Sequence, residues 1–128
     1  MPSVRFETCA GWIGDRHAAI AEAIQRTMVE AIRIPQHDRE IRIIEYPAHA
    51  FFPPPGRGPH YSLIEITLFA GRTIEAKRRL YAGLCTALAP FGIAVDDLKV
   101  VLLEVARENW GLGGKAGSDI EIGFKIDV

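Results

Sequence analysis

The sequence has no excess of either charge and no long apolar run. Its 15 lysines and arginines nearly balance 16 aspartates and glutamates, giving a formal net charge of −1, so no overall field attracts the chain to nucleic acid or to an anionic membrane. No apolar stretch approaches the roughly 20 residues of a membrane span. The segment 1–8 lacks the basic start and apolar core of a secretion signal. We therefore expect a cytoplasmic protein that binds neither nucleic acid nor membrane.

Residues that bind metals or form disulfides are scarce. Cys9 and Cys85 are the only cysteines and lie far apart in the sequence, so we expect free thiols in a reducing compartment. The four histidines are scattered, without HExxH or CxxC spacing. The glycine-rich segment 111–115 lacks the spacing of a phosphate loop, and no GxSxG motif is present. The sequence predicts neither a metal nor a cofactor.

The first half of the chain has the pattern of a strand, a helix and a second strand. Residues 3–8 predict a short strand, and apolar residues then recur at helical spacing from 20 to 32. Asp15 is a candidate N-cap, and Pro35 comes just after the helix and ends it. Residues 41–46 predict the second strand.

The second half repeats this order. Residues 62–69 predict a strand, Thr73 can cap the following helix, and leucines from 80 to 88 line one face of it. Residues 100–105 predict the closing strand. Ser3 aligns with Ser62 at an offset of 59, whereas the helix faces align at 60, which places one insertion in the turn between strand and helix. The shared order favours a duplication of halves 2–50 and 61–110, with chance similarity of two βαβ units as the alternative.

Two βαβ units predict an α/β (α+β) fold in a single domain, residues 1–128. A helical crossover favours parallel strands within each half, so the expected architecture is a four-stranded sheet with two helices on one face. The strands at 41–46 and 100–105 carry more apolar residues than a sheet exposed on one face requires. We expect a homo-oligomer, in which a partner subunit covers the second face.

Two segments lie outside the repeats. The linker 50–60 contains three consecutive prolines, so it is either a stiff connection or a loop that walls a pocket with Phe51, Phe52 and Arg57. The tail 118–128 alternates apolar and polar residues, which predicts a C-terminal strand or hairpin pairing within the chain or with a neighbouring subunit.

Several motifs together resemble the tautomerase superfamily, and within it malonate semialdehyde decarboxylase and its relatives. These motifs are the Met1-Pro2 start on a short strand, the segment 34–39 (IPQHDR), the Gly71-Arg72 turn and the segment 109–114 (NWGLGG). The resemblance covers nearly the whole chain. It implies the β-α-β tautomerase fold, a trimer and catalysis without a cofactor.

The resemblance also implies roles for individual residues. Removal of Met1 would free the Pro2 amine for catalysis, Arg72 would bind the substrate carboxylate, Asp38 would assist, and Trp110 would line the pocket. Each has a structural alternative: Arg72 as a solvated turn residue, Asp38 as a turn-stabilising residue matched by Asp97, and Trp110 as a core residue.

Tyr61 and Phe52 are further candidates for contact with the substrate. They come from the end of the linker and its aromatic pair, without a motif that assigns them a role. As aromatic residues beside a Pro-rich loop, they suit an apolar pocket wall. The alternative is an inert linker.

The chemistry follows from the amine. A free α-amine titrates near ~7.7–8.0, and burial beside a guanidinium lowers its pKa, so it can shuttle protons near neutral pH. We expect a cofactor-independent keto–enol tautomerase acting on small 2-keto or enol carboxylic acids. One alternative is a decarboxylase of the malonate semialdehyde type. That enzyme has two arginines at the turn, however, and Ala70 stands in place of the first. The other alternative is a non-catalytic oligomeric binding protein.

Overall fold

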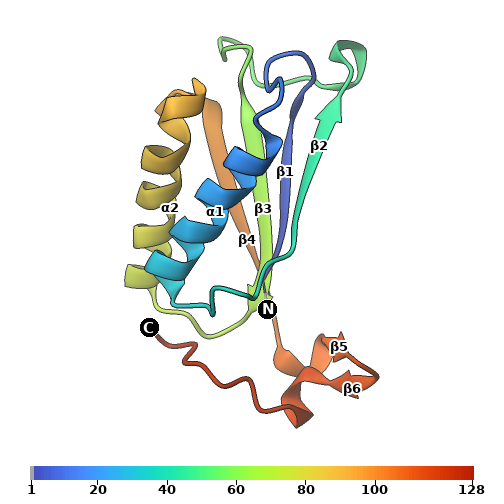
Figure 1. Ribbon diagram of the computed structural model, residues 1–128, viewed down its shortest axis with the longest axis vertical. Helices are drawn as coiled ribbons and strands as arrows, with labels where there is room; N and C mark the ends of the chain where they lie inside the picture. Colours follow the sequence, from blue (N-terminus) through green and yellow to red (C-terminus); the bar gives the residue numbers. More distant parts are fainter. Residues whose placement is uncertain (1) are drawn as a thin grey trace.

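The computed structural model describes residues 2–128 and contains one four-stranded sheet with two helices packed on one face (Figure 1). The strand order is β2-β1-β3-β4; β1 and β2 are parallel, β1 and β3 antiparallel, and β3 and β4 parallel. This confirms the predicted fold and the parallel pairing within each half. The elements are β1 (Ser3–Cys9), α1 (His17–Ile32), β2 (Ile41–Tyr46), β3 (Ser62–Phe69), α2 (Ile74–Leu88), β4 (Leu98–Val105), β5 (Gly111–Leu112) and β6 (Lys115–Ala116).

The core lies between the sheet and the helices. Alternate residues of β1 and β3 point to the helices, as period-two strands require, and Phe6 and Ile66 are fully buried there. Ile24 of α1 and Leu84 of α2 are also fully buried and belong to the same core cluster. Each such side chain contributes roughly 1.5–3 kcal/mol of hydrophobic stabilisation.

The strand register corrects the predicted alignment of the two halves. Val4 pairs with Ile41, and Ile64 pairs with Val100. Val4 and Ile64 both face the core, which gives an offset of 60 for the first strands, while Ile41 and Val100 give 59 for the second strands. The one-residue difference therefore lies between helix and second strand, rather than in the turn before the helix. An offset of 59 would match the core-facing residues of β1 with residues on the opposite face of β3, because a slip of one residue exchanges the two faces of a strand.

Equivalent contacts recur in the two halves. His17 Nε2 lies 2.8 Å from Glu45 Oε2 in the first half, and Lys77 forms an ion pair with Glu104 in the second. Both pairs join the start of a helix to the end of its second strand. The repeat is therefore present in side-chain contacts as well as in the order of elements.

Thr73 caps α2 as predicted, because its Oγ1 accepts a hydrogen bond from Ala76 N at 3.1 Å. Asp15 does not cap α1. The N-cap there is Arg16, which makes no side-chain cap bond. The helix ends with Arg33 in the left-handed region, φ 59°, two residues before Pro35. Cys9 and Cys85 are free thiols, as predicted.

Most of the tail does not pair as a strand within the chain, so that form of the prediction is wrong, whereas pairing with a neighbouring subunit stays a prediction. The chain forms a short β5–β6 hairpin, and residues 120–128 then run without strand pairing in the described chain, towards the start of α2 (Figure 1). The alternation is nevertheless present, since Ile120, Ile122, Phe124 and Ile126 are half-buried while the residues between them are exposed. The tail packs on its own chain through side chains instead of backbone pairing.

The sheet face opposite the helices is open in the single chain. Arg5 forms ion pairs there with Glu7 and Glu65, at 3.5 and 3.8 Å, and Leu103 is 44% exposed. Within residues 2–128 no helix is long and apolar enough to cross a membrane.

Candidate active site

A cavity of about 360 Å³ opens at the end of the sheet where β1 begins. Pro2, which is buried, lies at this end with Asp38 from the α1–β2 connection and Trp110 from the segment after β4. Leu112 of β5 and Phe124 of the tail complete the apolar wall. Three of the residues predicted for catalysis or binding are thus brought together around one cavity.

The connection that carries Asp38 is fixed by hydrogen bonds. Gln25 Nε2 on α1 donates to the carbonyl oxygens of Gln36 and Asp38 at 3.2 and 3.1 Å, and Asp38 N donates to Pro35 O at 3.0 Å. The connection then joins the sheet, where Val4 N donates to Glu40 O at 2.9 Å. Because the backbone is held on both sides, the Asp38 carboxyl has a defined place at the cavity, and its Oδ2 is buried.

Trp110 is held from three directions. Its indole Nε1 donates to Val105 O at 3.2 Å, its carbonyl accepts from Gly117 N at 2.7 Å, and its ring meets Phe69 edge-on with centroids 5.0 Å apart. Arg107 holds the segment that follows Trp110, since its guanidinium donates to Gly117 O and Ile120 O. Trp110 is half-buried and lines the cavity.

Arg72 is buried and follows the turn after β3. Only 6% of its surface is exposed, and neither its Nε nor its Nη1 has a hydrogen-bond partner among residues 2–128. Burial lowers the pKa of the guanidinium, and the nearby carboxylates of Glu104 and Asp38 act in the opposite direction. A buried guanidinium with free N–H groups is a strong potential site for an oxyanion, because leaving such donors unpaired is costly. Arg72 is therefore not the solvated turn residue of the alternative interpretation.

The tail supplies wall residues that sequence reasoning did not assign to the site. Ile122 and Phe124 line the cavity, and Ile126 Cγ2 lies within 3.3 Å of where a Cβ on Gly71 would be. Thr73 Oγ1 donates to Val128 O at 2.9 Å. The alternating pattern of the tail was the available signal, but it predicted strand pairing rather than a cavity wall.

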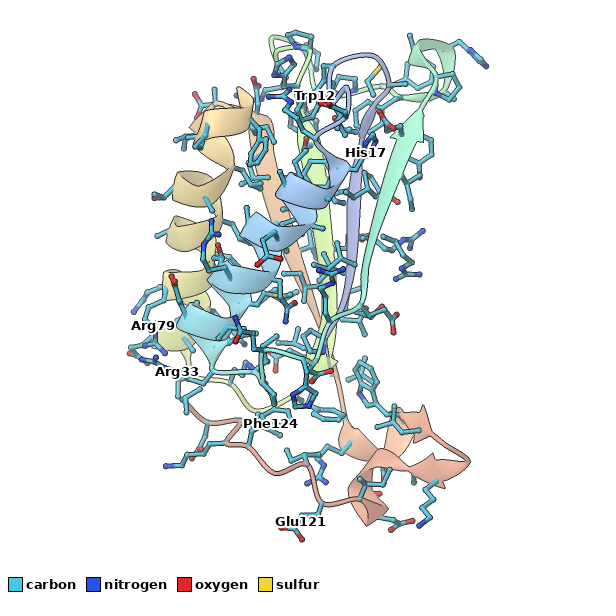
Figure 2. The ribbon with its side chains drawn as sticks, viewed as in Figure 1. Trp12, His17, Arg33, Arg79, Glu121 and Phe124 are labelled. Carbon is cyan, nitrogen blue, oxygen red and sulfur yellow. The ribbon has the colours of Figure 1, made fainter. Side chains whose placement is uncertain are left out.

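Tyr61 and Phe52 are not brought to this cavity within the chain. Tyr61 precedes β3, whose direction is opposite to that of β1, so it lies at the far end of the sheet, about 20 Å away at ~3.3 Å per strand residue. Phe52 is 86% exposed. Figure 2 shows the separation of the two ends, with Trp12 near one and Phe124 near the other.

No group of three or more His, Cys, Asp or Glu side chains in the described chain is arranged to hold a metal ion. The charged and polar side chains that line the cavity come from the α1–β2 connection, His37, Asp38, Arg39 and Glu40, and the buried guanidinium of Arg72 interacts electrostatically with Asp38. A guanidinium and a carboxylate placed near one another suit the binding of a small organic acid.

The chain matches known proteins along most of its length. A family model described as "Tautomerase enzyme" matches residues 17–113. "Probable tautomerase RSp0893" of Ralstonia nicotianae is 40% identical over 53 residues, covering 41% of this chain and 76% of that protein. "Probable tautomerase YusQ" of Bacillus subtilis is 27% identical over 127 residues, covering 94% and 100%.

Solved structures share the fold. FG41 malonate semialdehyde decarboxylase inhibited by 3-bromopropiolate is 29% identical with a TM-score of 0.73, covering 91% of this chain and 92% of that one. A fused 4-OT, described as a wild type asymmetric trimer, is 25% identical with a TM-score of 0.80, covering 91% and 96%.

Proposed function

The chain belongs to the tautomerase enzyme family, and from that premise we propose that it interconverts keto and enol forms of small 2-keto carboxylic acids, using the amine of Pro2. The proposal requires removal of Met1, which lies outside the described residues. Without that removal the Pro2 nitrogen is an amide and cannot act as a base.

One observation carries the proposal: the buried Arg72, whose Nε and Nη1 have no hydrogen-bond partner within residues 2–128, interacts electrostatically with Asp38, which lines the same cavity as Pro2. The guanidinium offers paired donors to a carboxylate or a 2-oxo group. Asp38 supplies a carboxylate that can accept a hydrogen bond from the enol hydroxyl of the substrate. Trp110 and Phe124 provide an apolar wall for the rest of the molecule.

The proposed reaction moves one proton from oxygen to carbon. The neutral Pro2 amine takes the proton from the enol O–H, the C2–O bond becomes a carbonyl as the C2=C3 bond opens, and C3 receives a proton from the Pro2 ammonium. The amine is neutral again at the end. Burial and the positive charge of Arg72 both disfavour the ammonium form, which keeps the amine basic enough but unprotonated near neutral pH.

We further propose a homotrimer. The trimers among the solved relatives support it, as does the open sheet face with Arg5 and the exposed Leu103. Size-exclusion chromatography with light scattering tests this directly, and a monomer at micromolar concentration would contradict it.

The test of the main proposal is enol ketonisation. The enol of phenylpyruvate is followed by ultraviolet absorbance with protein whose free Pro2 amine has been verified by mass spectrometry. Pro2→Ala is expected to lose about 10²–10⁴-fold in kcat/KM, the usual contribution of a positioned acid–base group. Retained activity in Pro2→Ala, or in a form that keeps Met1, would defeat the mechanism.

The decarboxylase remains a second candidate because of the similarity to the FG41 enzyme. Malonate semialdehyde loses carbon dioxide in that reaction, so gas release separates it from ketonisation. Ala70 provides no second arginine at the turn, which favours the tautomerase. If neither reaction proceeds while small carboxylates still bind, the protein is the non-catalytic binding protein of the third hypothesis.

A further inference from the structure

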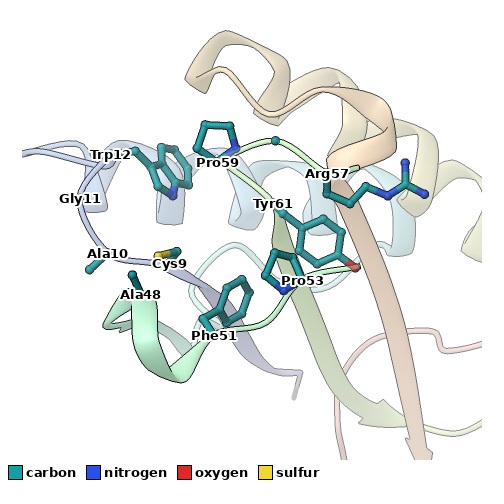
Figure 3. A pocket seen from close by; sticks show the side chains of 11 residues that line it. Cys9, Ala10, Gly11, Trp12, Ala48, Phe51, Pro53, Arg57, Pro59 and Tyr61 are labelled. Carbon is teal, nitrogen blue, oxygen red and sulfur yellow. The ribbon is translucent and has the colours of Figure 1, made fainter. Parts of the chain in front are cut away.

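A second cavity, of about 400 Å³, lies at the opposite end of the sheet. Aromatic side chains from the turn after β1 and from the linker surround it, and Arg57 lies at its rim with the guanidinium directed outward (Figure 3). This volume is within the range of sites for small organic molecules. The cavity includes neither Pro2 nor Arg72, so the proposed reaction does not use it.

The repeat relates this cavity to the one at Pro2. The turn after β1, Ala10-Gly11-Trp12, is equivalent to Ala70-Gly71-Arg72 after β3 at the offset of 60, and the two glycines have matching φ values of 111° and 121°. Both turns occupy the end of the sheet where the partner strand begins.

The wall after the second strand of each half is also equivalent. Short 3-10 helices at Ala48–Ala50 and Arg107–Asn109 are followed by Phe51 and Trp110, both extended, at the offset of 59. Phe51 and Pro53 line the second cavity, as their counterparts Trp110 and Leu112 line the first. The turn after β1 and the segment after β2, which both line the second cavity, therefore correspond in the repeat to the turn after β3 and the segment after β4.

The groups that would perform the reaction are replaced. Pro2 corresponds to Ser62, whose nitrogen is a backbone amide inside the chain, and Arg72 corresponds to Trp12. Asp38 corresponds to Asp97, which makes the same backbone bond to the residue three positions earlier, but whose Oδ1 accepts from Gly58 N at 3.0 Å. What remains is an apolar site without an amine base.

The side chains that line the second cavity indicate which kind of ligand it would bind. Trp12, Phe51 and Tyr61 offer aromatic surfaces for a flat apolar body. Arg57 is exposed and its guanidinium forms no ion pair or hydrogen bond with any residue from 2 to 128, so it can pair with an anionic group at the mouth. We infer that this cavity binds a small aromatic carboxylate, apolar end inward, and does not transform it. The inference depends on these side chains and not on the chemistry of Pro2.

The two tryptophans allow each cavity to be observed separately. Trp110→Phe leaves Trp12 as the only tryptophan, in the second cavity, and Trp12→Phe leaves Trp110 in the first. In Trp110→Phe, benzoate is expected to change Trp12 fluorescence saturably, whereas acetate and benzyl alcohol, which lack the ring or the charge, bind at least tenfold more weakly. Arg57→Gln in the same background is expected to raise the Kd for benzoate about tenfold, the worth of one charge-assisted hydrogen bond. Circular dichroism verifies that each variant is folded.

A second measurement uses the chain without substitutions. Cys9 lines the second cavity and Cys85 lies on α2, so benzoate is expected to slow alkylation of Cys9 several-fold and leave Cys85 unaffected, as resolved by mass spectrometry. An unchanged Trp12 signal in millimolar benzoate, equal Kd values in Arg57→Gln and its parent, or unprotected Cys9 would each overturn the inference. None of these readouts needs turnover, so failure of the proposed reaction would leave them unaltered.

Discussion

Trp12 occupies in the first half of the chain the position that Arg72 holds in the second. Both follow an Ala-Gly pair whose glycine has a positive φ, and both lie at the end of a central strand. One end of the sheet therefore carries a buried cation and the other a half-buried indole. This difference between equivalent positions underlies the different chemistry proposed for the two cavities.

Substitution of Arg72 should affect substrate binding according to the shape of the side chain. Arg72→Gln removes the charge and the paired donors and is expected to lower kcat/KM for enol ketonisation by about 10²-fold or more, as for a bidentate carboxylate contact. Arg72→Lys retains the charge but not the planar fork, so its kcat/KM should lie between those of the unsubstituted protein and Arg72→Gln. Steady-state kinetics with Trp12→Phe as the matched control, at the equivalent turn, checks this order. Full activity in Arg72→Gln would remove Arg72 from the site.

The same substitution should shift the pH profile of the remaining activity. In the proposed mechanism the Pro2 amine acts as a base when neutral, so kcat/KM is expected to fall as the pH drops below the amine pKa. A positive charge near an amine favours its neutral form, so the proposal predicts that Arg72→Gln moves the acidic limb of the profile to higher pH. Rates measured from pH 5 to 9 would show the direction, and a shift to lower pH would contradict it.

Asp38 and Asp97 form a matched pair for testing the assisting role proposed for Asp38. Asp38→Asn is expected to lower kcat about tenfold or more, because the carboxyl lines the cavity proposed for catalysis. Asp97→Asn weakens the bond to Gly58 N and should lower the free energy of unfolding by about 0.5–1.5 kcal/mol while leaving ketonisation nearly unchanged. Denaturant unfolding and kinetics on both variants separate the effects. Equal loss of kcat in the two would indicate a structural role for Asp38.

The ion pair between Lys77 and Glu104 should make stability depend on pH. The hydrogen bond from Lys77, with a smaller contribution from Gly71 N, lowers the pKa of Glu104 below its ordinary value. A carboxyl whose pKa is lower in the folded state stabilises the fold above its unfolded pKa, and this stabilisation is lost as the pH falls through the folded pKa. Glu104→Gln should therefore cost about 0.5–1 kcal/mol at pH 7, and the difference should shrink below pH 4. Glu75→Gln, at an exposed position on α2, serves as the control.

Thr73 joins the cap of α2 to the tail. Thr73→Ala should lower the free energy of unfolding by about 1 kcal/mol through loss of the cap, and it should also raise hydrogen exchange in residues 120–128, because the bond to Val128 O is lost. Thr73→Ser keeps the hydroxyl, so it should retain most of the stability and most of the protection of residues 120–128 from hydrogen exchange. If Ser and Ala behave alike, the hydroxyl contributes to neither.

Much of the fold could be predicted because periodicity encodes it directly. The strands at 41–46 and 62–69 have the predicted bounds, and Thr73 caps the predicted helix. The offset between the two halves could not be determined from matching residue types alone. The match of Ser3 with Ser62 favoured an offset of 59, whereas burial of Val4 and Ile64 on one face requires 60.

The candidate site could be predicted only in part. Pro2, Asp38 and Trp110 meet at one cavity because the motifs that suggested them come from one end of the fold. Tyr61 precedes β3 and therefore belongs to the other end, which is evident only once β1 and β3 are known to be antiparallel. Phe124 was missed because its position in the cavity wall depends on the path of a tail without regular secondary structure.

The matching turns at Gly11 and Gly71 separate backbone shape from chemical character. The glycine sets the path of the chain, and the residue after it, Trp12 or Arg72, can change from an aromatic group to a cation without altering that path. Side-chain replacement at these two positions can therefore change what each turn binds, whereas catalysis at the second cavity would also need a free amine, which the backbone amide of Ser62 does not supply. Engineering of a new acid-binding centre should begin at position 12, where the supporting backbone is already present.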